Sequence, residues 1–281
     1  MKEKIAIQGI EGSFHHQVAQ ECFGKTAELK KCMSFEEVAQ SLQNSEAGVG
    51  IMAIENSIAG AIFPNFQLVD KYELEITGEY YLPVQMNLLA VPGQKIEDVK
   101  RVFSHPMALL QCRDYFRNFP EIELVDDADT ASVAKRISEA GTKNVAAVAS
   151  KTAAELFGLQ VLAENIHNRE TNTTRFFVLR SKQERLLNAN KATLKLTAEK
   201  EADISAFLEL QEKLDLELLD LHKNKLNRGR ELFAELLFRD QEQLQQALKL
   251  MQPKLKLLGM YRNRLPQHLQ EKPMFTKAKA V

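Results

Sequence analysis

The chain has 281 residues, of which 44% are hydrophobic and 27% are charged, and its formal net charge is −1. This length and composition are typical of a globular protein of two domains with a substantial buried core. Because the net charge is close to zero and only the C-terminal tail is weakly basic, neither a nucleic acid nor a membrane surface is expected as a partner.

The three cysteines, Cys22, Cys32 and Cys112, are odd in number and form no CxxC pair. Free thiols in a reducing compartment are therefore expected. Residues 1–12 lack the apolar core of a signal peptide, and no run approaches the roughly 20 apolar residues of a membrane helix. These observations make the cytoplasm the expected location.

Short apolar segments alternate with helical patterns over residues 1–180. Strands are expected at about residues 4–9, 47–56, 83–93, 100–105, 122–127, 143–150 and 176–179. Helices are expected at about residues 13–24, 34–43, 106–116, 130–140 and 151–158. Because the strands are continuously apolar, helices should cover both faces of their sheet, which predicts an α/β fold.

The pattern changes near residue 181, where a polar connector begins. Beyond it, strands are expected at about 192–198, 216–223, 230–238 and 254–261, with helices at 203–214 and 240–251. The order strand, helix, strand, strand, helix, strand is typical of a ferredoxin-like domain, here at residues 191–262. Residues 264–281 have no periodicity and are expected to form a loose tail.

Polar residues follow the first two long strands. In "GIEGSFHH", residues 9–16, Gly12 permits a tight turn and Ser13 can cap a helix whose N–H groups could bind an anion. The stretch matches neither the dinucleotide fingerprint nor the P-loop, and an ordinary turn is the alternative. In "AIENSIAG", Glu55, Asn56 and Ser57 lie at a strand's carboxyl end, where open α/β sheets bind ligands, unless they merely cap the next helix.

Two further stretches have the same arrangement. In "FSHPMALLQC", Ser104 is expected to cap a helix, Pro106 suits its first turn, and Gln111 lies two turns along the same face. In "HNRETNTTRFFVL", Thr174 and Arg175 stand at the entry to an apolar strand. A well-capped helix and an edge threonine beside a solvated arginine are the respective alternatives.

The chemistry of these stretches is clearer when they are taken together. The sequence contains no metal-ligand spacing and no Ser-His-Asp order, so neither a metal nor a catalytic triad is expected. Four polar loops at the strand ends of one α/β sheet predict a cleft that binds a small, anionic molecule.

In this order the four stretches resemble the prephenate dehydratase family, which carries GPEGTF, PIENS, SHPQAL followed by QC, and TRF. The corresponding segments here are "GIEGSF", "AIENS", "SHPMALLQC" and "TTRF", and the resemblance covers roughly residues 4–180. It implies a catalytic domain at 1–182 made of two hinged α/β lobes, similar to periplasmic binding proteins. Lobe one would be about 1–78 plus 174–180, and lobe two about 83–165.

The resemblance also implies an activity and a site. The family converts prephenate to phenylpyruvate, water and carbon dioxide in L-phenylalanine biosynthesis, without a cofactor. Thr174 matches the essential threonine and is the expected catalytic residue. The residues expected to bind the substrate are Gly12, Ser13, Glu55, Asn56, Ser57, Ser104, Gln111 and Arg175. Arg175 and the Gly9–Ser13 turn would meet the carboxylates of the substrate.

The chain departs from the family pattern at four positions. Ile10 and Ala53 replace prolines, Met107 replaces a glutamine, and Asn87 falls where a histidine is common. None of these changes removes Thr174, so they bear on the details of binding rather than on the reaction.

The second domain resembles an ACT domain, the family's phenylalanine-sensing module. Its GAL and ESRP motifs would fall at residues 202–204 and 222–225, where the chain has "ADI" and "HKNK". Loss of the glycine closes the backbone approach that an amino acid needs, so weak or absent feedback by phenylalanine is predicted. A dimerisation module is the favoured interpretation, within a homodimer or homotetramer.

Two alternatives to a prephenate dehydratase remain open. An arogenate dehydratase would produce phenylalanine directly, and the motifs do not separate the two substrates. A non-catalytic protein that binds a small anion could use the same fold, although the intact "TTRF" argues against it.

Overall fold

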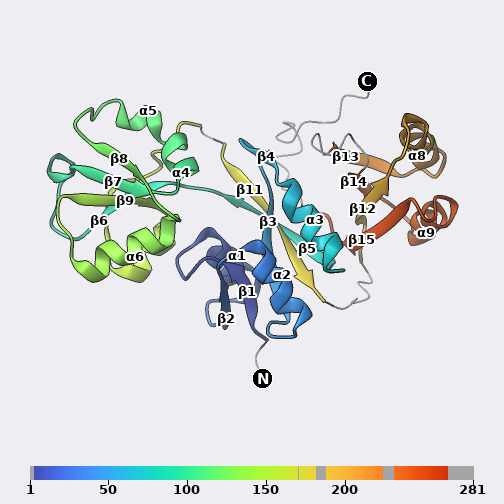
Figure 1. Ribbon diagram of the computed structural model, residues 1–281, viewed down its shortest axis with the longest axis horizontal. Helices are drawn as coiled ribbons and strands as arrows, with labels where there is room; N and C mark the ends of the chain where they lie inside the picture. The colour runs from blue at the N-terminus through green and yellow to red at the C-terminus, as the bar shows by residue number, and fades with distance from the viewer. Residues whose placement is uncertain (1–2, 170, 182–187, 224–230, 265–281) are drawn as a thin grey trace.

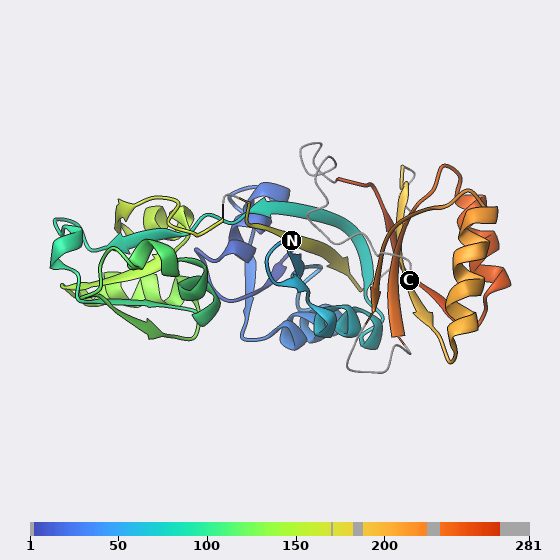
Figure 2. The same ribbon diagram turned by 90° about the horizontal axis from the view of Figure 1, so that it is seen from above.

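Three β-sheets follow one another along the long axis of the molecule (Figure 1, Figure 2). The computed structural model describes residues 3–169, 171–181, 188–223 and 231–264. The predicted tail from residue 265 onward, and residues 182–187 of the predicted connector, lie outside the described residues. No helix among those described is long and apolar enough to cross a membrane.

The central sheet belongs to lobe one and has the strand order β2-β1-β3-β11-β5, with β4 paired to β3. Its strands are β1 (Ile5–Gln8), β2 (Leu29–Cys32), β3 (Val49–Asn56), β4 (Gly60–Ala61), β5 (Glu75–Pro83) and β11 (Thr173–Arg180). Its helices are α1 (Phe14–Phe23), α2 (Phe35–Gln43) and α3 (Phe63–Lys71). β1 runs parallel to β2 and β3, whereas β11 runs antiparallel to both β3 and β5. The predicted α/β architecture is confirmed here.

Lobe two is built on a second sheet, of order β10-β6-β9-β7-β8. Its strands are β6 (Asn87–Ala90), β7 (Arg101–Ser104), β8 (Glu123–Asp126), β9 (Val145–Ala149) and β10 (Gln160–Ala163). Its helices are η1 (Ile96–Asp98), α4 (Pro106–Gln111), α5 (Arg113–Phe116), α6 (Thr130–Ala140) and α7 (Lys151–Phe157). The single helix predicted at 106–116 is wrong, because the chain turns at Cys112 and makes two short helices.

The chain crosses between the two lobes twice. β5 ends at Pro83 and β6 begins at Asn87, so the single strand predicted at 83–93 is divided by the first crossing. The second crossing leads from β10 back into β11. Thr173, the first residue of β11, is paired with Pro83, the last of β5, and Val84 N–H donates to Asn172 O (2.6 Å). The two crossings therefore leave the central sheet side by side.

The third sheet has the order β13-β14-β12-β15, and every neighbouring pair is antiparallel. Its elements are β12 (Lys191–Thr197), α8 (Glu201–Lys213), β13 (Glu217–Lys223), β14 (Glu231–Leu237), α9 (Gln241–Leu250) and β15 (Leu255–Tyr261). This succession is the predicted βαββαβ order. Figure 2 shows α8 and α9 on the face that points away from lobe one.

The opposite face of the third sheet packs against lobe one. Phe233, Leu258 and Tyr261 join a buried cluster with Phe66 and Phe177 of lobe one. The approach is close, because a Cβ at residue 259 of β15 would lie 2.2 Å from the carbonyl oxygen of residue 76 in β5. A glycine at position 259 is therefore needed for this contact.

Candidate active site

A cavity of about 540 Å³ lies between lobe one and lobe two. Its wall includes the ends of three central strands, through Gln8 of β1, Asn56 of β3 and Thr174 of β11. Lobe two contributes Gln111 from the end of α4. Strand ends of lobe one and a helix end of lobe two thus meet at one space.

The N-termini of four helices also border this cavity. They belong to α1, α2, α4 and α6, whose N-cap residues Ser13, Ser34, His105 and Asp129 all line it. Each cap side chain satisfies one backbone N–H of its own helix. Other N–H groups in each first turn have no partner within the helix, and the helix dipole is positive at this end. The cavity is therefore suited to an anion.

The side-chain charge of the cavity wall differs from the expectation. Among the described residues that line the cavity, none is a lysine or an arginine. His15 does line it, but burial lowers the pKa of His15 to about 4, so its imidazole is neutral at pH 7. The predicted arginine is thus not found on the described part of this wall, and favourable charge comes from backbone N–H groups.

A chain of hydrogen-bonded amides connects the two lobes at the cavity. Asn172 Nδ2 donates to Gln111 Oε1 (2.9 Å) in lobe two, and Asn56 Nδ2 donates to Asn172 Oδ1 (2.9 Å). Asn56 Nδ2 also donates to Thr174 Oγ1 (2.9 Å). Asn56 is itself fixed, because its Oδ1 accepts the backbone N–H groups of Ile58 and Ala59.

This arrangement determines what Thr174 can do. Its hydroxyl oxygen accepts a hydrogen bond from Asn56, so its own O–H remains to be donated to a molecule in the cavity. The neighbouring Phe176 lines the same cavity, since residues two apart share one face of a strand. Thr174 is thus a fixed hydrogen-bond donor in a mostly apolar wall.

Four of the nine predicted site residues line the cavity. They are Ser13, Asn56, Gln111 and Thr174. The other five, Gly12, Glu55, Ser57, Ser104 and Arg175, do not line it. Asn172 was not singled out from the sequence, although it lies in the same polar stretch as Thr174.

Gly12 and Ser104, two of the predicted site residues that do not line the cavity, have structural contacts instead. Gly12 has a φ of +87°, its carbonyl accepts the Ser150 hydroxyl of lobe two (2.7 Å), and a Cβ would meet the Phe157 ring at 3.1 Å. It therefore brings the lobes into contact. Ser104 is the last residue of β7, and its hydroxyl donates to Val148 O (2.6 Å). The prediction that Ser104 caps a helix is wrong, because His105 is the N-cap of α4.

Ser57 secures the second crossing between the lobes. Its hydroxyl accepts the Thr173 N–H (3.0 Å) and donates to Thr171 O (3.4 Å). Its backbone N–H donates to Thr173 O (2.9 Å). Ser57 thus positions the start of β11 and, through it, Thr174.

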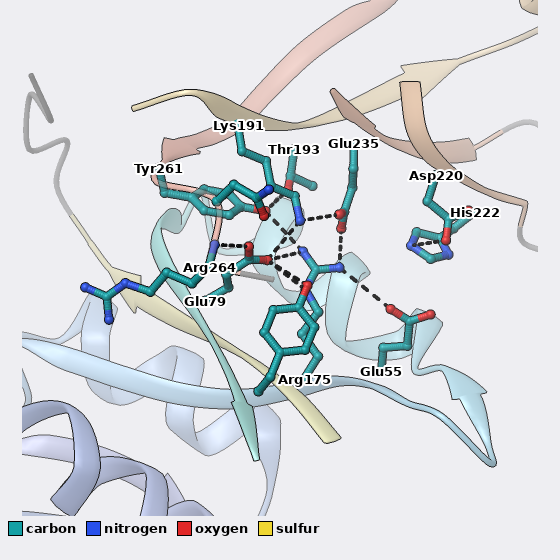
Figure 3. Close-up of polar contacts among 12 residues, drawn as sticks. Glu55, Glu79, Arg175, Lys191, Thr193, Asp220, His222, Glu235, Tyr261 and Arg264 are labelled. Atoms are coloured by element: carbon teal, nitrogen blue, oxygen red, sulfur yellow. Dashed lines mark hydrogen bonds and ion pairs between the residues drawn. The ribbon is translucent and has the colours of Figure 1, made fainter. Parts of the chain in front are cut away.

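Arg175 lies on the other face of β11 and points toward the third sheet (Figure 3). Its guanidinium contacts Glu79 (2.8 Å), Glu235 (2.6 Å) and Glu55 (3.6 Å). Only 2% of Arg175 is exposed. The expectation that Arg175 meets a substrate carboxylate is corrected by this geometry, because residues 174 and 175 face opposite sides of the strand.

Arg175 belongs to a group that we call the interdomain charge cluster. Its members are Glu55, Glu79, Arg175, Lys191 and Glu235. Lys191 Nζ lies 2.9 Å from both Glu79 and Glu235. Burial opposes ionisation of Glu235, but Arg175 and Lys191 hold its pKa well below the usual range. By contrast, burial raises the pKa of Glu55 to about 8 despite the attraction of Arg175.

Comparison with known families matches the part of the chain that builds the two lobes. The family model described as prephenate dehydratase matches residues 5–184, which include both lobes and all the strands that meet at the cavity. The chain belongs to the prephenate dehydratase family. The arogenate dehydratase/prephenate dehydratase 1 of Arabidopsis thaliana is 39% identical over 178 residues, 63% of this chain and 45% of the plant protein. The chain spans about half the length of the curated relatives it matches.

Solved structures support the same fold for this family member. A prephenate dehydratase of Arthrobacter aurescens, determined in complex with L-Phe, has a TM-score of 0.80 at 23% identity, covering 92% of this chain and 90% of that one. A protein described as GqqA, a novel type of quorum quenching acylase, also has a TM-score of 0.80, at 24% identity, with 92% and 97% covered. Because one fold carries two differently described functions, these likenesses establish architecture alone.

Proposed function

We propose that this chain is a prephenate dehydratase, which converts prephenate to phenylpyruvate, carbon dioxide and water. The observation that carries the proposal is the position of Thr174. Its hydroxyl is held by Asn56 at the wall of a cavity that four helix N-termini also border. Family membership makes this reaction the first choice for such a site.

The cavity suits the charge of prephenate, which carries two carboxylates. With no lysine or arginine among the described lining residues, the carboxylates would accept hydrogen bonds from backbone N–H groups at the helix N-termini. The N-termini of α1 and α2 come from lobe one and those of α4 and α6 from lobe two. An anion held from both lobes would stabilise the pairing of the lobes around it.

The chemical step requires a ring hydroxyl to leave while the ring carboxylate departs as carbon dioxide. The electron pair of the breaking C–C bond completes the aromatic ring, and the leaving oxygen takes up a proton to become water. Thr174 is a poor acid, so its role is to donate a hydrogen bond to the charge that develops on this oxygen. Losing one such preorganised donor typically costs about 10²–10³-fold in rate.

Arogenate is the second candidate substrate, because the Arabidopsis relative is described as acting on arogenate as well as prephenate. Arogenate has the same ring and leaving group, so Thr174 would act identically. The difference lies in the side chain, where an amino group replaces the keto group. Asp129 is a carboxylate on the cavity wall that could meet this ammonium, although it already accepts hydrogen bonds from Ser132.

Turnover by the purified chain tests the proposal. Phenylpyruvate should form from prephenate, and phenylalanine should form from arogenate if that is the substrate. Binding without turnover, measured by equilibrium dialysis with each compound, would identify a non-catalytic small-anion binder instead. The absence of both turnover and binding would contradict the assignment of the cavity as the site.

We also propose that residues 191–262 form an ACT-like module that joins subunits rather than sensing phenylalanine. The support is its βαββαβ order and the two edge strands, β13 and β15, that could pair with another copy. L-Phenylalanine added during turnover should leave the rate unchanged, and light scattering should give the mass of a dimer or tetramer. The free cysteines Cys22, Cys32 and Cys112 are consistent with the reducing cytoplasm as the location.

A further inference from the structure

A second group of polar side chains lies between lobe one and the third sheet, behind the cavity. Glu55 is the penultimate residue of β3, and Asp220 and His222 are two residues apart on β13, so that they share one face of that strand. One ligand-type atom from each of the three lies within 4.8 Å of the other two. Figure 3 shows Asp220 and His222 together, beside Glu55 at the edge of the interdomain charge cluster.

The histidine has an unsatisfied nitrogen in this group. His222 Nε2 is buried and has no hydrogen-bond partner among the described residues, and only 8% of the residue is exposed. The nearest acidic oxygen is Asp220 Oδ2, at 3.7 Å, which is too far for a hydrogen bond. The ring is held in place by Phe66, whose centroid is 5.2 Å away. A buried polar atom without a partner is costly, so its position calls for an explanation.

The other two members of the group supply oxygen ligands. Glu55 and Asp220 come from different domains, and each places a carboxyl oxygen within 4.8 Å of a nitrogen of His222. A divalent cation shared by two carboxylates and one imidazole would give the unpartnered nitrogen a ligand bond and hold the three side chains together.

We propose that Glu55, Asp220 and His222 bind a divalent transition-metal ion that joins lobe one to the C-terminal domain. One imidazole nitrogen and two carboxylate oxygens form a ligand set that Zn²⁺ and Co²⁺ accept, with water in a fourth position. Ligand atoms around tetrahedral Zn²⁺ are about 3.3 Å apart, given bond lengths of about 2.0–2.1 Å. The three side chains would have to close in by about 1.5 Å at most from their present separation, which rotation about side-chain bonds can supply.

Such an ion would lie next to a residue of the cavity wall. Glu55 is paired with Arg175 in the β3–β11 ladder, and the next pair in that ladder is Asn56 with Thr174. A metal ligand and a cavity residue are therefore adjacent on β3. The two domains contribute ligands that are more than 160 residues apart in the chain, which is why no local spacing in the sequence revealed them.

Direct metal binding tests the inference without reference to catalysis. The chain, freed of metal with a chelator, is titrated with Zn²⁺ by calorimetry and with Co²⁺ by visible absorption. We expect one ion per chain, and binding at least about 100-fold weaker in Asp220→Asn and in His222→Gln, since even partners outside the ligand set cost 10- to 100-fold. Asp215→Asn is the matched control, because Asp215 lies in the same domain but its side chain is 71% exposed and pairs with the exposed Arg239.

Three results would overturn the inference. They are the absence of saturable binding by the wild-type chain, equal affinity in Asp220→Asn and Asp215→Asn, and a thiolate-to-cobalt absorption band, which would place the ion on a cysteine. Circular dichroism of the metal-free proteins checks that both variants are folded. Because Asp220→Asn preserves the shape of the side chain, it keeps the test decisive if His222→Gln does not fold. Failure here leaves the proposed dehydratase activity untouched, since turnover is not the readout.

Discussion

The two faces of strand β11 show opposite ways of handling charge. Thr174 and Phe176 face the interlobe cavity, where favourable charge comes from helix N-termini and no lysine or arginine is found among the described lining residues. Arg175 and Phe177 face the C-terminal domain, where a buried arginine and Lys191 pair with carboxylates. One face of the strand therefore borders a cavity suited to a bound anion. The other face carries an arginine whose anionic partners, Glu79 and Glu235, belong to the protein itself.

The difference shows why a cation need not be present for anion recognition. A side-chain cation inside the cavity would require its own compensation whenever the ligand was absent, whereas backbone N–H groups are only partial charges. On the other face, the side chains of Glu79 and Glu235 are part of the protein and are always present. Arg175 and Lys191 therefore have partners there whether or not a ligand is bound. The motif "TTRF" thus combines two functions that alternate along one strand.

The largest predicted effect is a loss of stability when Arg175 is replaced. Arg175→Met leaves Glu79 and Glu235 with only Lys191 as a buried cation, so the free energy of unfolding should fall by about 3–5 kcal/mol. Urea denaturation followed by circular dichroism measures the change. An unchanged midpoint would show that the interdomain charge cluster contributes nothing to the association of the domains.

An exposed ion pair provides the control for this variant. Lys71 contacts Glu36 at 2.7 Å, but the two side chains are 62% and 48% exposed. Lys71→Met should therefore leave the urea midpoint essentially where it is, because exposed pairs contribute little. A loss as large as that of Arg175→Met would mean that burial is not what distinguishes the two pairs.

The next predicted effect is a loss of catalytic rate when the hydroxyl of Thr174 is removed. Thr174→Val keeps the shape of the side chain but removes the hydroxyl, so kcat with prephenate should fall by about 10²–10³-fold with little change in KM. Thr174→Ser restores a hydroxyl and should recover most of the rate. Phenylpyruvate formation is the measurement, and near wild-type turnover by Thr174→Val would remove Thr174 from the mechanism.

A further predicted effect is a gradual pH dependence of stability from Glu55. Its pKa is about 8 in the folded chain and about 4.5 when unfolded, so the folded chain holds the extra proton between these values. The contribution of Glu55 to the free energy of unfolding is therefore undiminished below pH 4.5 and decreases as pH rises toward 8. The slope is at most about 1.4 kcal/mol per pH unit.

Glu55→Gln should abolish this part of the pH dependence. In the presence of a chelator, the stability of the variant relative to the wild type should increase steadily from about pH 5 to about pH 8. The carboxylate of Glu235 has its pKa lowered, so its contribution is lost only as pH falls below about 4.5, outside this window. Parallel stability curves for the two proteins would show that Glu55 is ionised throughout.

Much of the cavity was predictable from local sequence. Apolar strands followed by polar residues placed Asn56 and Thr174 at strand ends, and Ser13 was recognised as a helix cap. The cap of α6, Asp129, carries the same signal as Ser13 and could have been found. Local sequence does not show which helix N-termini meet at the cavity, because α2 and α6 come from different lobes.

The prediction that Arg175 binds the substrate was wrong, and the sequence contained a reason to doubt it. Alternation along a strand sets adjacent residues on opposite faces, so Arg175 could not share the surface of Thr174. Its true partners could not be inferred, because Glu79, Lys191 and Glu235 come from three strands that only the complete fold brings together. Ser104 illustrates a smaller error, since its hydroxyl is used within lobe two and not at the helix start.

The paired exits of the chain from the central sheet make lobe two an insertion in the architectural sense. Pro83 and Thr173 are direct neighbours in the β5–β11 ladder, about 5 Å apart as such pairs are, so a short turn could connect them. Joined in this way, β5 and β11 would become an ordinary hairpin and lobe one would keep its full set of strands. Lobe two is thus an exchangeable unit, and half of the cavity could be replaced without redesigning the scaffold that carries Thr174.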